Sequence, residues 1–282
     1  MAVYMRHTAI ALENVSVSFA ASTQHDVLRN ISLKISPQEQ VAIIGPSGAG
    51  KSTLLETLAM ARQPSKGMYA LNNQQPWQLS SAARHELRAN IFLVPQIPPL
   101  PPRQRVVTTV LAGKLPRWSF WQALSSLIYP TQSPVAFKAL SAFDMQDKLY
   151  SRVDRLSGGE RQRVSLARLF ASDANMMLVD EPLSALDPTL AASVLGAIQR
   201  EASLRCATLV CSLHQVELAR LHFPRLVGVR DGCILFDLPQ AAVTNELIEQ
   251  LYANRDIAPK TFARDAITPQ PELLPLPNGN VC

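Results

Sequence analysis

The chain has 282 residues, of which 47% are hydrophobic and 17% charged, with a formal net charge of +5. This length predicts one or two domains with a sizeable core, and the mild charge predicts an ordinary solvated surface rather than a nucleic-acid-binding one. No apolar run reaches the ~18–20 residues of a membrane span, no export signal is visible at the N-terminus, and four scattered cysteines favour reduced thiols in the cytosol.

Two segments near the N-terminus, residues 9–19 and 27–35, alternate between apolar and polar side chains. This period, together with the β-branched residues, predicts antiparallel strands with one solvated face. Phe19 ends the first segment. Its ring could stack on an adenine or simply pack in the core, and the pattern alone favours the core.

A glycine-rich segment follows an apolar run at 41–44, which predicts a buried strand, and precedes a helical run expected to reach about Arg62. Its pattern is G-x-x-x-x-G-K-[S/T], and this strand–helix context makes a phosphate-binding loop more plausible than a turn without a ligand. The residues are Gly45, Pro46, Ser47, Gly48, Ala49, Gly50, Lys51, Ser52 and Thr53.

Each part of this loop suits a nucleoside triphosphate. Glycines let successive backbone N–H groups point at phosphate oxygens, and the helix that opens at Lys51 adds the positive end of its dipole. Lys51 supplies a charge for the β- and γ-phosphates, and the Ser52 hydroxyl is a ligand for Mg²⁺. The loop alone leaves the task of the protein open.

The next elements predict a short strand at 68–71, a helix at 80–88, and a buried strand at 91–94 that is followed by Pro95 and Gln96. Residues 97–102 are too rich in proline for a helix or a central strand. Residues 104–150 then look mostly helical, which predicts a helical insertion between two halves of an α/β core. Its basic aromatic segment at 113–121 is either a docking site or a loop whose Trp side chains pack locally.

A second helix start is predicted at Leu156-Ser157-Gly158-Gly159-Glu160, because Ser157 and Glu160 have capping-box spacing. Gly158 and Gly159 weaken a first helical turn. They make sense if a ligand must approach the bare backbone, and the N–H groups of a helix N-terminus bind anions.

The apolar strand predicted at 176–179 ends in Asp180 and Glu181. Two carboxylates at the end of a buried strand indicate a function: Asp180 as the Mg²⁺ partner of the phosphate loop and Glu181 as the residue that polarises the attacking water. The alternative is a pair of helix-capping acids. Asp187, before Pro188, is the predicted N-cap of the next helix.

Another buried strand, at 207–213, delivers His214 to its end, where ligands of parallel sheets bind. A closing hairpin is predicted at 226–236. Residues 253–282 carry five prolines in a polar, charge-mixed segment, and we expect this tail to be poorly ordered.

These motifs occur in one order, and together they resemble the ATP-binding subunit of an ABC transporter over roughly residues 8–250. The resemblance implies an α/β fold of the ABC ATPase type: a RecA-like P-loop NTPase core with an antiparallel β subdomain and an inserted helical subdomain. The expected domain spans 1–252, with the core at 1–96 and 164–252 and the helical subdomain at about 97–163. The tail follows at 253–282.

The resemblance also implies a head-to-tail dimer that closes over two ATP. Each ATP would lie between one chain's phosphate loop and the other chain's Ser157, Gly158 and Gly159, with Asp187 facing the partner. Among the remaining implied roles, Phe19 stacks on adenine, Gln96 senses Mg²⁺ and the water, and His214 holds the γ-phosphate and orients Glu181. The implied cofactors are ATP and Mg²⁺, with Ser52, Gln96 and Asp180 as the metal ligands.

Segments 110–115, 213–219 and 229–232 look like the ATPase subunit of phosphonate importers. Pro95 in place of an aromatic residue, the prolines at 98–102, and Ser212 in place of a common Asn depart from that subfamily.

The resemblance therefore implies ATP hydrolysis that drives import of a phosphonate or related phosphorus oxyanion. The implied partners are membrane permease subunits and, indirectly, a periplasmic solute-binding protein, with no nucleic acid. The implied location is the cytoplasmic face of the inner membrane. The alternative is an ATPase of a soluble enzyme assembly, such as one that cleaves carbon–phosphorus bonds.

Overall fold

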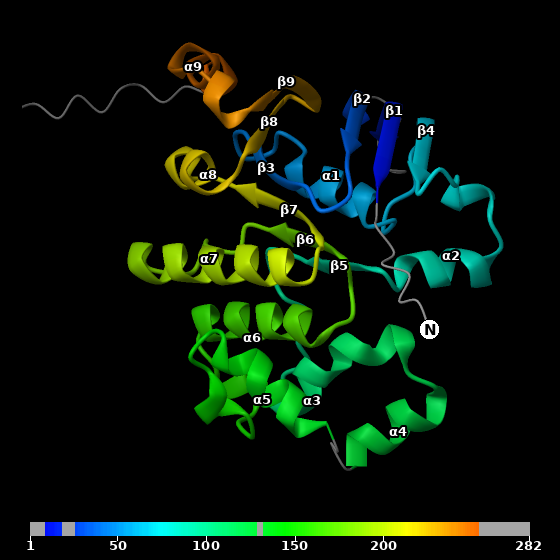
Figure 1. The fold of residues 1–282 in the computed structure, drawn as a ribbon, viewed down its shortest axis with the longest axis vertical. Coiled ribbons are helices and arrows are strands. Elements are labelled where there is room, and N and C mark those ends of the chain that lie inside the picture. The colour runs from blue at the N-terminus through cyan, green and yellow to red at the C-terminus, as the bar shows by residue number, and fades with distance from the viewer. Residues whose placement is uncertain (1–8, 19–25, 129–131, 254–282) are drawn as a thin grey trace, which may run out of the picture. The chain divides into compact units, whose positions relative to one another are not determined.

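The computed structural model describes residues 9–18, 26–128 and 132–253. The expectations for Phe19 and for residues 254–282 of the tail therefore fall outside the described residues. The described residues up to Tyr252 belong to one compact unit, whose elements are shown in Figure 1. Within the described ranges, no helix combines the length and apolar character required to cross a membrane.

Two sheets organise this unit. The smaller is antiparallel in the order β2-β1-β4, and the larger has the order β5-β6-β7-β3-β8-β9, parallel except for the β8–β9 pair. The strands are β1 (Ile10–Ser18), β2 (Asp26–Ile35), β3 (Gln40–Ile44), β4 (Lys66–Leu71), β5 (Ile91–Val94), β6 (Met176–Asp180), β7 (Thr208–Leu213), β8 (Arg225–Arg230) and β9 (Cys233–Pro239). The predicted α/β fold with an antiparallel subdomain is confirmed.

The helices are α1 (Lys51–Leu58), α2 (Ser81–Arg88), α3 (Val106–Leu111), α4 (Phe120–Ile128), α5 (Ser133–Ser141), α6 (Gly158–Ala171), α7 (Pro188–Leu204), α8 (Val216–His222) and α9 (Asn245–Tyr252). Helix α1 covers one face of the larger sheet, and α6, α7 and α8 lie on the other face (Figure 1). Helices α3, α5 and α6 pack on one another. Helices α3, α4 and α5 lie within the expected helical subdomain of about 97–163, whereas α6 begins there and continues to Ala171, beyond the expected boundary.

The core explains why the central strands read as unbroken apolar runs. Alternate residues of β3 enter different hydrophobic clusters: Ala42 and Ile44 pack on the side of α6 and α7, whereas Val41 and Ile43 pack on the side of α1 and the smaller sheet. A strand that is buried on both faces has no polar face, so its alternation disappears from the sequence.

One boundary differs from the prediction. The first helix was expected to reach about Arg62, but α1 ends at Leu58. Met60 has a φ of +54°, a left-handed conformation in which a helix cannot continue. The helical pattern beyond Leu58 is therefore a turn, in which Arg62 forms an ion pair with Glu56 at 2.8 Å.

Candidate functional site

The glycine-rich loop connects β3 to α1, and two of its glycines have no room for a side chain. Gly45 has a φ of +153°, and a Cβ atom there would lie 2.0 Å from the Val229 carbonyl oxygen. Gly50, with a φ of +103°, is the N-cap of α1 and gives that helix no side-chain cap. The first N–H groups of α1 therefore have no side-chain acceptor from their own N-cap, which suits them to bind phosphate.

Lys51 folds back over this loop. Its Nζ atom donates hydrogen bonds to the carbonyl oxygens of Gly45, at 2.8 Å, and Pro46, at 3.1 Å. The same atom lies 3.8 Å from Oε1 of Glu181, and the Lys51 side chain is only 4% exposed. A buried ammonium group needs such partners, and they hold its charge between the loop and the end of β6.

Glu181 directly follows β6 and is held at both carboxylate oxygens. Nε2 of Gln96 donates to Oε2 at 2.7 Å, and Nε2 of His214 lies 2.5 Å from Oε1. Glu181 is 8% exposed and His214 is 40% exposed, so the pair links a buried carboxylate to an imidazole at the surface. The carboxylate is thus oriented by residues that follow two other strands, β5 and β7.

These groups surround one cavity of about 250 Å³. It lies at the carboxyl ends of β3, β5, β6 and β7, the edge of a parallel sheet where ligands bind. The lining residues are Val27, Ser47, Gly48, Gly50, Lys51, Ser52, Thr53, Gln96, Glu181 and His214. The structure therefore brings most of the predicted phosphate loop together with Gln96, Glu181 and His214.

The predicted metal ligands have the chemistry that Mg²⁺ prefers. Ser52 and Gln96 line the cavity, whereas Asp180, which ends β6, is only 5% exposed and is not among the lining residues. Mg²⁺ binds hard oxygen ligands and usually takes only one or two carboxylates, with water and substrate phosphates completing the shell. A hydroxyl, an amide oxygen and a single carboxylate fit that requirement.

The structure places Ser157, Gly158, Gly159 and Asp187 outside this cavity. Ser157 caps α6 in a complete capping box: its Oγ accepts from the N–H of Glu160, and Oε2 of Glu160 accepts from the N–H of Ser157. These bonds to Ser157 lower the pKa of Glu160, with a further contribution from Lys148. Ser157, Gly158 and Asp187 are exposed, so they face outward from their own chain.

Gly159 is less open than Gly158. A Cβ atom on Gly159 would lie 2.9 Å from the carbonyl oxygen of Ala185, whereas one on Gly158 would meet nothing within 4 Å. The N-terminus of α6 thus packs on the segment that follows β6, which also contains Asp187, the N-cap of α7. The sequence explained both glycines by a single approaching ligand, but the structure gives Gly159 an intrachain reason as well.

Two residues at this site had no predicted functional role. Gln162 on α6 donates from Nε2 to the Glu181 carbonyl at 3.2 Å, and Ser212 on β7 contacts both Asp180 and Glu181. Ser212 is a polar residue in the mainly apolar run of β7, which is the signal that could have identified it. Gln162 is 3% exposed and Ser212 is fully buried.

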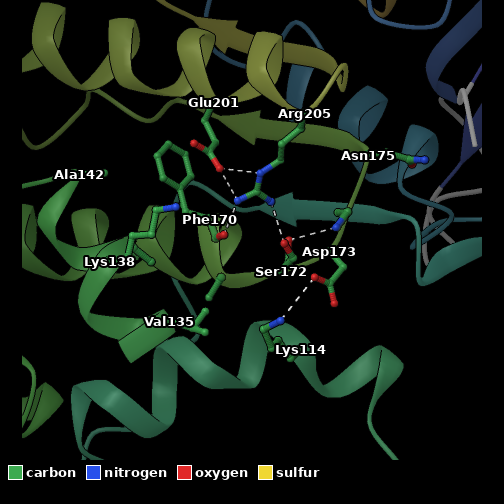
Figure 2. Close-up of a pocket in the computed structure, with 13 residues that line it drawn as sticks. Lys114, Val135, Lys138, Ala142, Phe170, Ser172, Asp173, Asn175, Glu201 and Arg205 are labelled. Carbon is green, nitrogen blue, oxygen red and sulfur yellow. Dashed lines mark hydrogen bonds and ion pairs between the residues drawn. The ribbon is translucent and has the colours of Figure 1, made fainter. Parts of the chain in front are cut away.

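A larger cavity, of about 610 Å³, lies elsewhere, between α5, α6 and α7. Figure 2 shows that most of its charged side chains bind one another: Arg205 pairs with Glu201, and Lys114 pairs with Asp173 at 3.4 Å. Arg205 also donates to the carbonyl oxygens of Ser172 and Phe170. Because these charges are already neutralised, the smaller cavity at the glycine-rich loop is the better candidate site.

Comparison with known proteins assigns the family. The model of the ABC transporter family matches residues 28–184, which is more than half of the chain. The chain belongs to this family. The family assignment made from the sequence motifs is therefore confirmed, and with it an ATPase of the ABC type.

Two curated relatives are similar over most of their length. The phosphonates import ATP-binding protein of Albidiferax ferrireducens is 57% identical over 86% of this chain and 89% of its own. A protein of Polaromonas sp. that is also named a phosphonates import ATP-binding protein is 53% identical over the same shares of the two chains. A solved dimeric ATP-binding cassette with ADP and phosphate bound has a TM-score of 0.69 and 24% identity, and the match covers 82% of this chain and 98% of that one. This last similarity concerns the fold.

Proposed function

We propose that this chain hydrolyses ATP to drive import of a phosphonate or a related phosphorus oxyanion. The observation that carries the hydrolysis is the Glu181 carboxylate, held by Gln96 and His214 on the cavity of the phosphate loop. The names of the relatives at 57% and 53% identity support the transported class. Those names also favour an importer over a soluble carbon–phosphorus-cleaving assembly.

In the proposed mechanism, the loop N–H groups and Lys51 bind the β- and γ-phosphates, and Glu181 accepts a proton from water as the water attacks the γ-phosphorus. The bond to the β–γ bridging oxygen breaks, and ADP and phosphate are the products. His214 contacts the γ-phosphate and keeps Glu181 oriented, while Gln96 positions the water. Mg²⁺, when bound by Ser52, Gln96 and Asp180, supplies charge that offsets the charge of the phosphates.

The proposal includes another copy of the same chain as a partner. Ser157, Gly158 and Asp187 are exposed and lie outside the cavity of their own chain, and the N-terminus of α6 is a site for an anion. A head-to-tail dimer would bring these residues, with Gly159, to the phosphates held by the partner. The similarity to a dimeric cassette is consistent with this arrangement.

The proposal also includes a membrane permease as a partner. This partner would place the chain at the cytoplasmic face of the inner membrane, with a periplasmic solute-binding protein on the opposite side of that membrane. The surface that supports this partner is an apolar patch on the helical insertion, formed by the exposed side chains of Leu115, Phe120, Trp121 and Leu124. A groove of about 230 Å³ runs through it. Exposed apolar patches of this kind mark interaction sites.

The structure distinguishes Trp118 from Trp121, the two residues for which the sequence left both docking and local packing open. Trp118 packs against the core, whereas Trp121 is 75% exposed and forms an edge-to-face pair with Phe120. Trp118 thus supports the fold. Trp121 is the residue of the two that is available to a permease.

The test is growth of the host with a phosphonate as the only phosphorus source, after the chain's gene has been replaced by variants. Wild type should restore growth and Glu181→Gln should not. Phe120→Ser with Trp121→Ser should abolish growth and co-purification of a polytopic membrane protein, yet leave ATP binding intact. Leu221→Ser is the matched control, because Leu221 is 77% exposed on α8, away from the patch. Growth that is independent of the chain would refute the transported class.

A further inference from the structure

A single buried hydroxyl joins the Asp180 carboxylate to the backbone N–H of Glu181 at the end of β6. Ser212 is fully buried on β7, the strand that separates β3, which leads to the phosphate loop, from β6. It stands in register with Asp180 on one side and Ile43 on the other. A hydroxyl in such a position is costly unless its hydrogen bonds are satisfied.

The two hydrogen bonds of this hydroxyl have fixed directions. Oγ of Ser212 donates to Oδ1 of Asp180 at 2.5 Å and accepts from the backbone N–H of Glu181 at 2.9 Å. An ionised carboxylate only accepts and a backbone N–H only donates, so the serine must do one of each. The bond to the carboxylate is charge-assisted, and such bonds are the stronger kind.

Glu181 needs this support because its backbone is strained. Its φ is +47°, a left-handed conformation that non-glycine residues rarely adopt. Such a conformation persists only where the surroundings hold it. Here the N–H of Glu181 bonds to Oγ and, at 3.3 Å, to the carbonyl of Ser212, and the carbonyl of Glu181 accepts from Gln162.

We propose that Ser212 is a positioning residue for hydrolysis: its one hydroxyl sets both the direction of the Asp180 carboxylate and the backbone turn that aims Glu181 into the cavity. This inference rests on the proposed roles of Asp180 in holding Mg²⁺ and of Glu181 in accepting the proton. Ser212 itself is not among the residues that line the cavity, so it acts through these two residues.

The inference predicts an effect on metal use as well as on rate. In Ser212→Ala, Oδ1 of Asp180 loses its donor, and the N–H of Glu181 keeps only the carbonyl at 3.3 Å. Loss of a partner that orients a metal ligand typically costs ~10–100-fold in metal affinity or activity. We therefore expect a higher half-saturating Mg²⁺ concentration and a lower kcat, each by ~10-fold or more. Binding of trinitrophenyl-ATP without Mg²⁺ should be unchanged, because the phosphate loop is intact.

The matched control is Thr208→Val, at the other end of the same strand. The Thr208 hydroxyl is also buried and accepts a backbone N–H, that of Gln38 at 2.9 Å, but it contacts neither carboxylate. The unfolding temperature of this variant should fall, as that of Ser212→Ala should, while its kcat and Mg²⁺ dependence remain those of wild type. Ser212→Thr retains the hydroxyl and should recover most of the Mg²⁺ dependence.

The experiment measures phosphate release by the full chain against Mg²⁺ concentration, with the thermal unfolding midpoint of every variant. Unchanged kcat and Mg²⁺ dependence in Ser212→Ala would overturn the inference, as would the same changes in Thr208→Val. If Ser212→Ala does not fold, Ser212→Cys provides the test, because its weak donor should raise the Mg²⁺ requirement in a folded chain. Wild type and Glu181→Gln are run alongside, because failure of wild type to release phosphate refutes the proposed function itself.

Discussion

Nε2 of His214 lies 2.5 Å from Oε1 of Glu181, although the two residues follow different strands and differ in burial: the His214 side chain is 40% exposed and the Glu181 side chain is 8% exposed. With Gln96 on the second oxygen, the carboxylate has a fixed orientation before any reaction begins. A general base must lie within hydrogen-bond reach of the proton it accepts, so this orientation selects where the attacking water can be deprotonated.

Replacing Glu181 by Gln should keep ATP binding and abolish turnover. The amide has nearly the same shape but cannot accept the proton of the water, and loss of a general base costs ~10²–10⁴ in rate. ATP-bound dimers should accumulate, which size-exclusion chromatography with radiolabelled ATP would detect. Glu249→Gln, in an exposed position on α9, is the control. Hydrolysis close to wild type in Glu181→Gln would exclude Glu181 as the base.

Gly158→Ala should separate folding from hydrolysis. A Cβ atom at Gly158 meets nothing within 4 Å in its own chain, and alanine is the better helix former, so the unfolding temperature should stay or rise. Hydrolysis should nevertheless fall if the partner's phosphate approaches this backbone.

Gly159→Ala is the comparison, because its Cβ would press on the Ala185 carbonyl at 2.9 Å and should lower the unfolding temperature. Circular dichroism and phosphate release measure both effects. Wild-type hydrolysis by Gly158→Ala would contradict an approach of phosphate at this position.

A mixture of two inactive variants tests whether sites are shared between chains. Ser157→Arg removes the cap of α6 and adds bulk at the proposed interface, while Lys51→Ala removes the charge at the phosphate loop. A mixed dimer holds one site with both defects and one with neither, so hydrolysis should reappear on mixing.

If the mixture remains inactive, nucleotide crosslinking to Ser157→Arg alone decides between cooperating sites and an unshared site. Retained crosslinking would mean that both sites must work together. Lost crosslinking would place Ser157 in the pocket of its own chain and contradict the shared site.

Glu160 should make the stability of the chain sensitive to acid. The hydrogen bonds to Ser157 lower the pKa of this carboxyl in the folded chain, so its stabilising effect is complete above the unfolded pKa of ~4.3 and is lost as the pH falls through the folded value. Glu160→Gln lacks this titration, and its unfolding free energy should fall less steeply below about pH 5 than that of wild type. Urea unfolding across pH 3–6 provides the measurement; identical slopes would show that the capping box contributes no acid sensitivity.

The sequence was informative where local chemistry decides the structure. The capping box of Ser157 and Glu160 and the N-cap of Asp187 depend on residues three apart, and both form as the spacing predicts. The glycine-rich loop was equally clear, because its pattern and its flanking strand and helix are contiguous.

Contacts between residues far apart in the sequence could not be predicted from local patterns. The bond between Ser212 and Asp180 joins residues 32 apart, and that between Gln96 and Glu181 joins residues 85 apart. The predicted end of α1 was also wrong. Met60 has a left-handed backbone conformation, but methionine is not a residue type that indicates such a turn. The family resemblance assigned Gln96 a place at the site, whereas it marked Ser212 only as a departure from the subfamily and gave it no role.

The strand order has a consequence for the synthesis of the chain. β3, which carries the glycine-rich loop, is flanked in the sheet by β7 and β8, whose residues come more than 160 positions later. Pairing across such a distance is slow, because a long loop must close before the contacts form. On the ribosome, β3 therefore cannot pair until both of its neighbours have been made. A fragment that stops after the helical insertion contains the whole glycine-rich segment without the sheet that shapes it. The emerging protein becomes competent for nucleotide only after β7 and β8 have been synthesised.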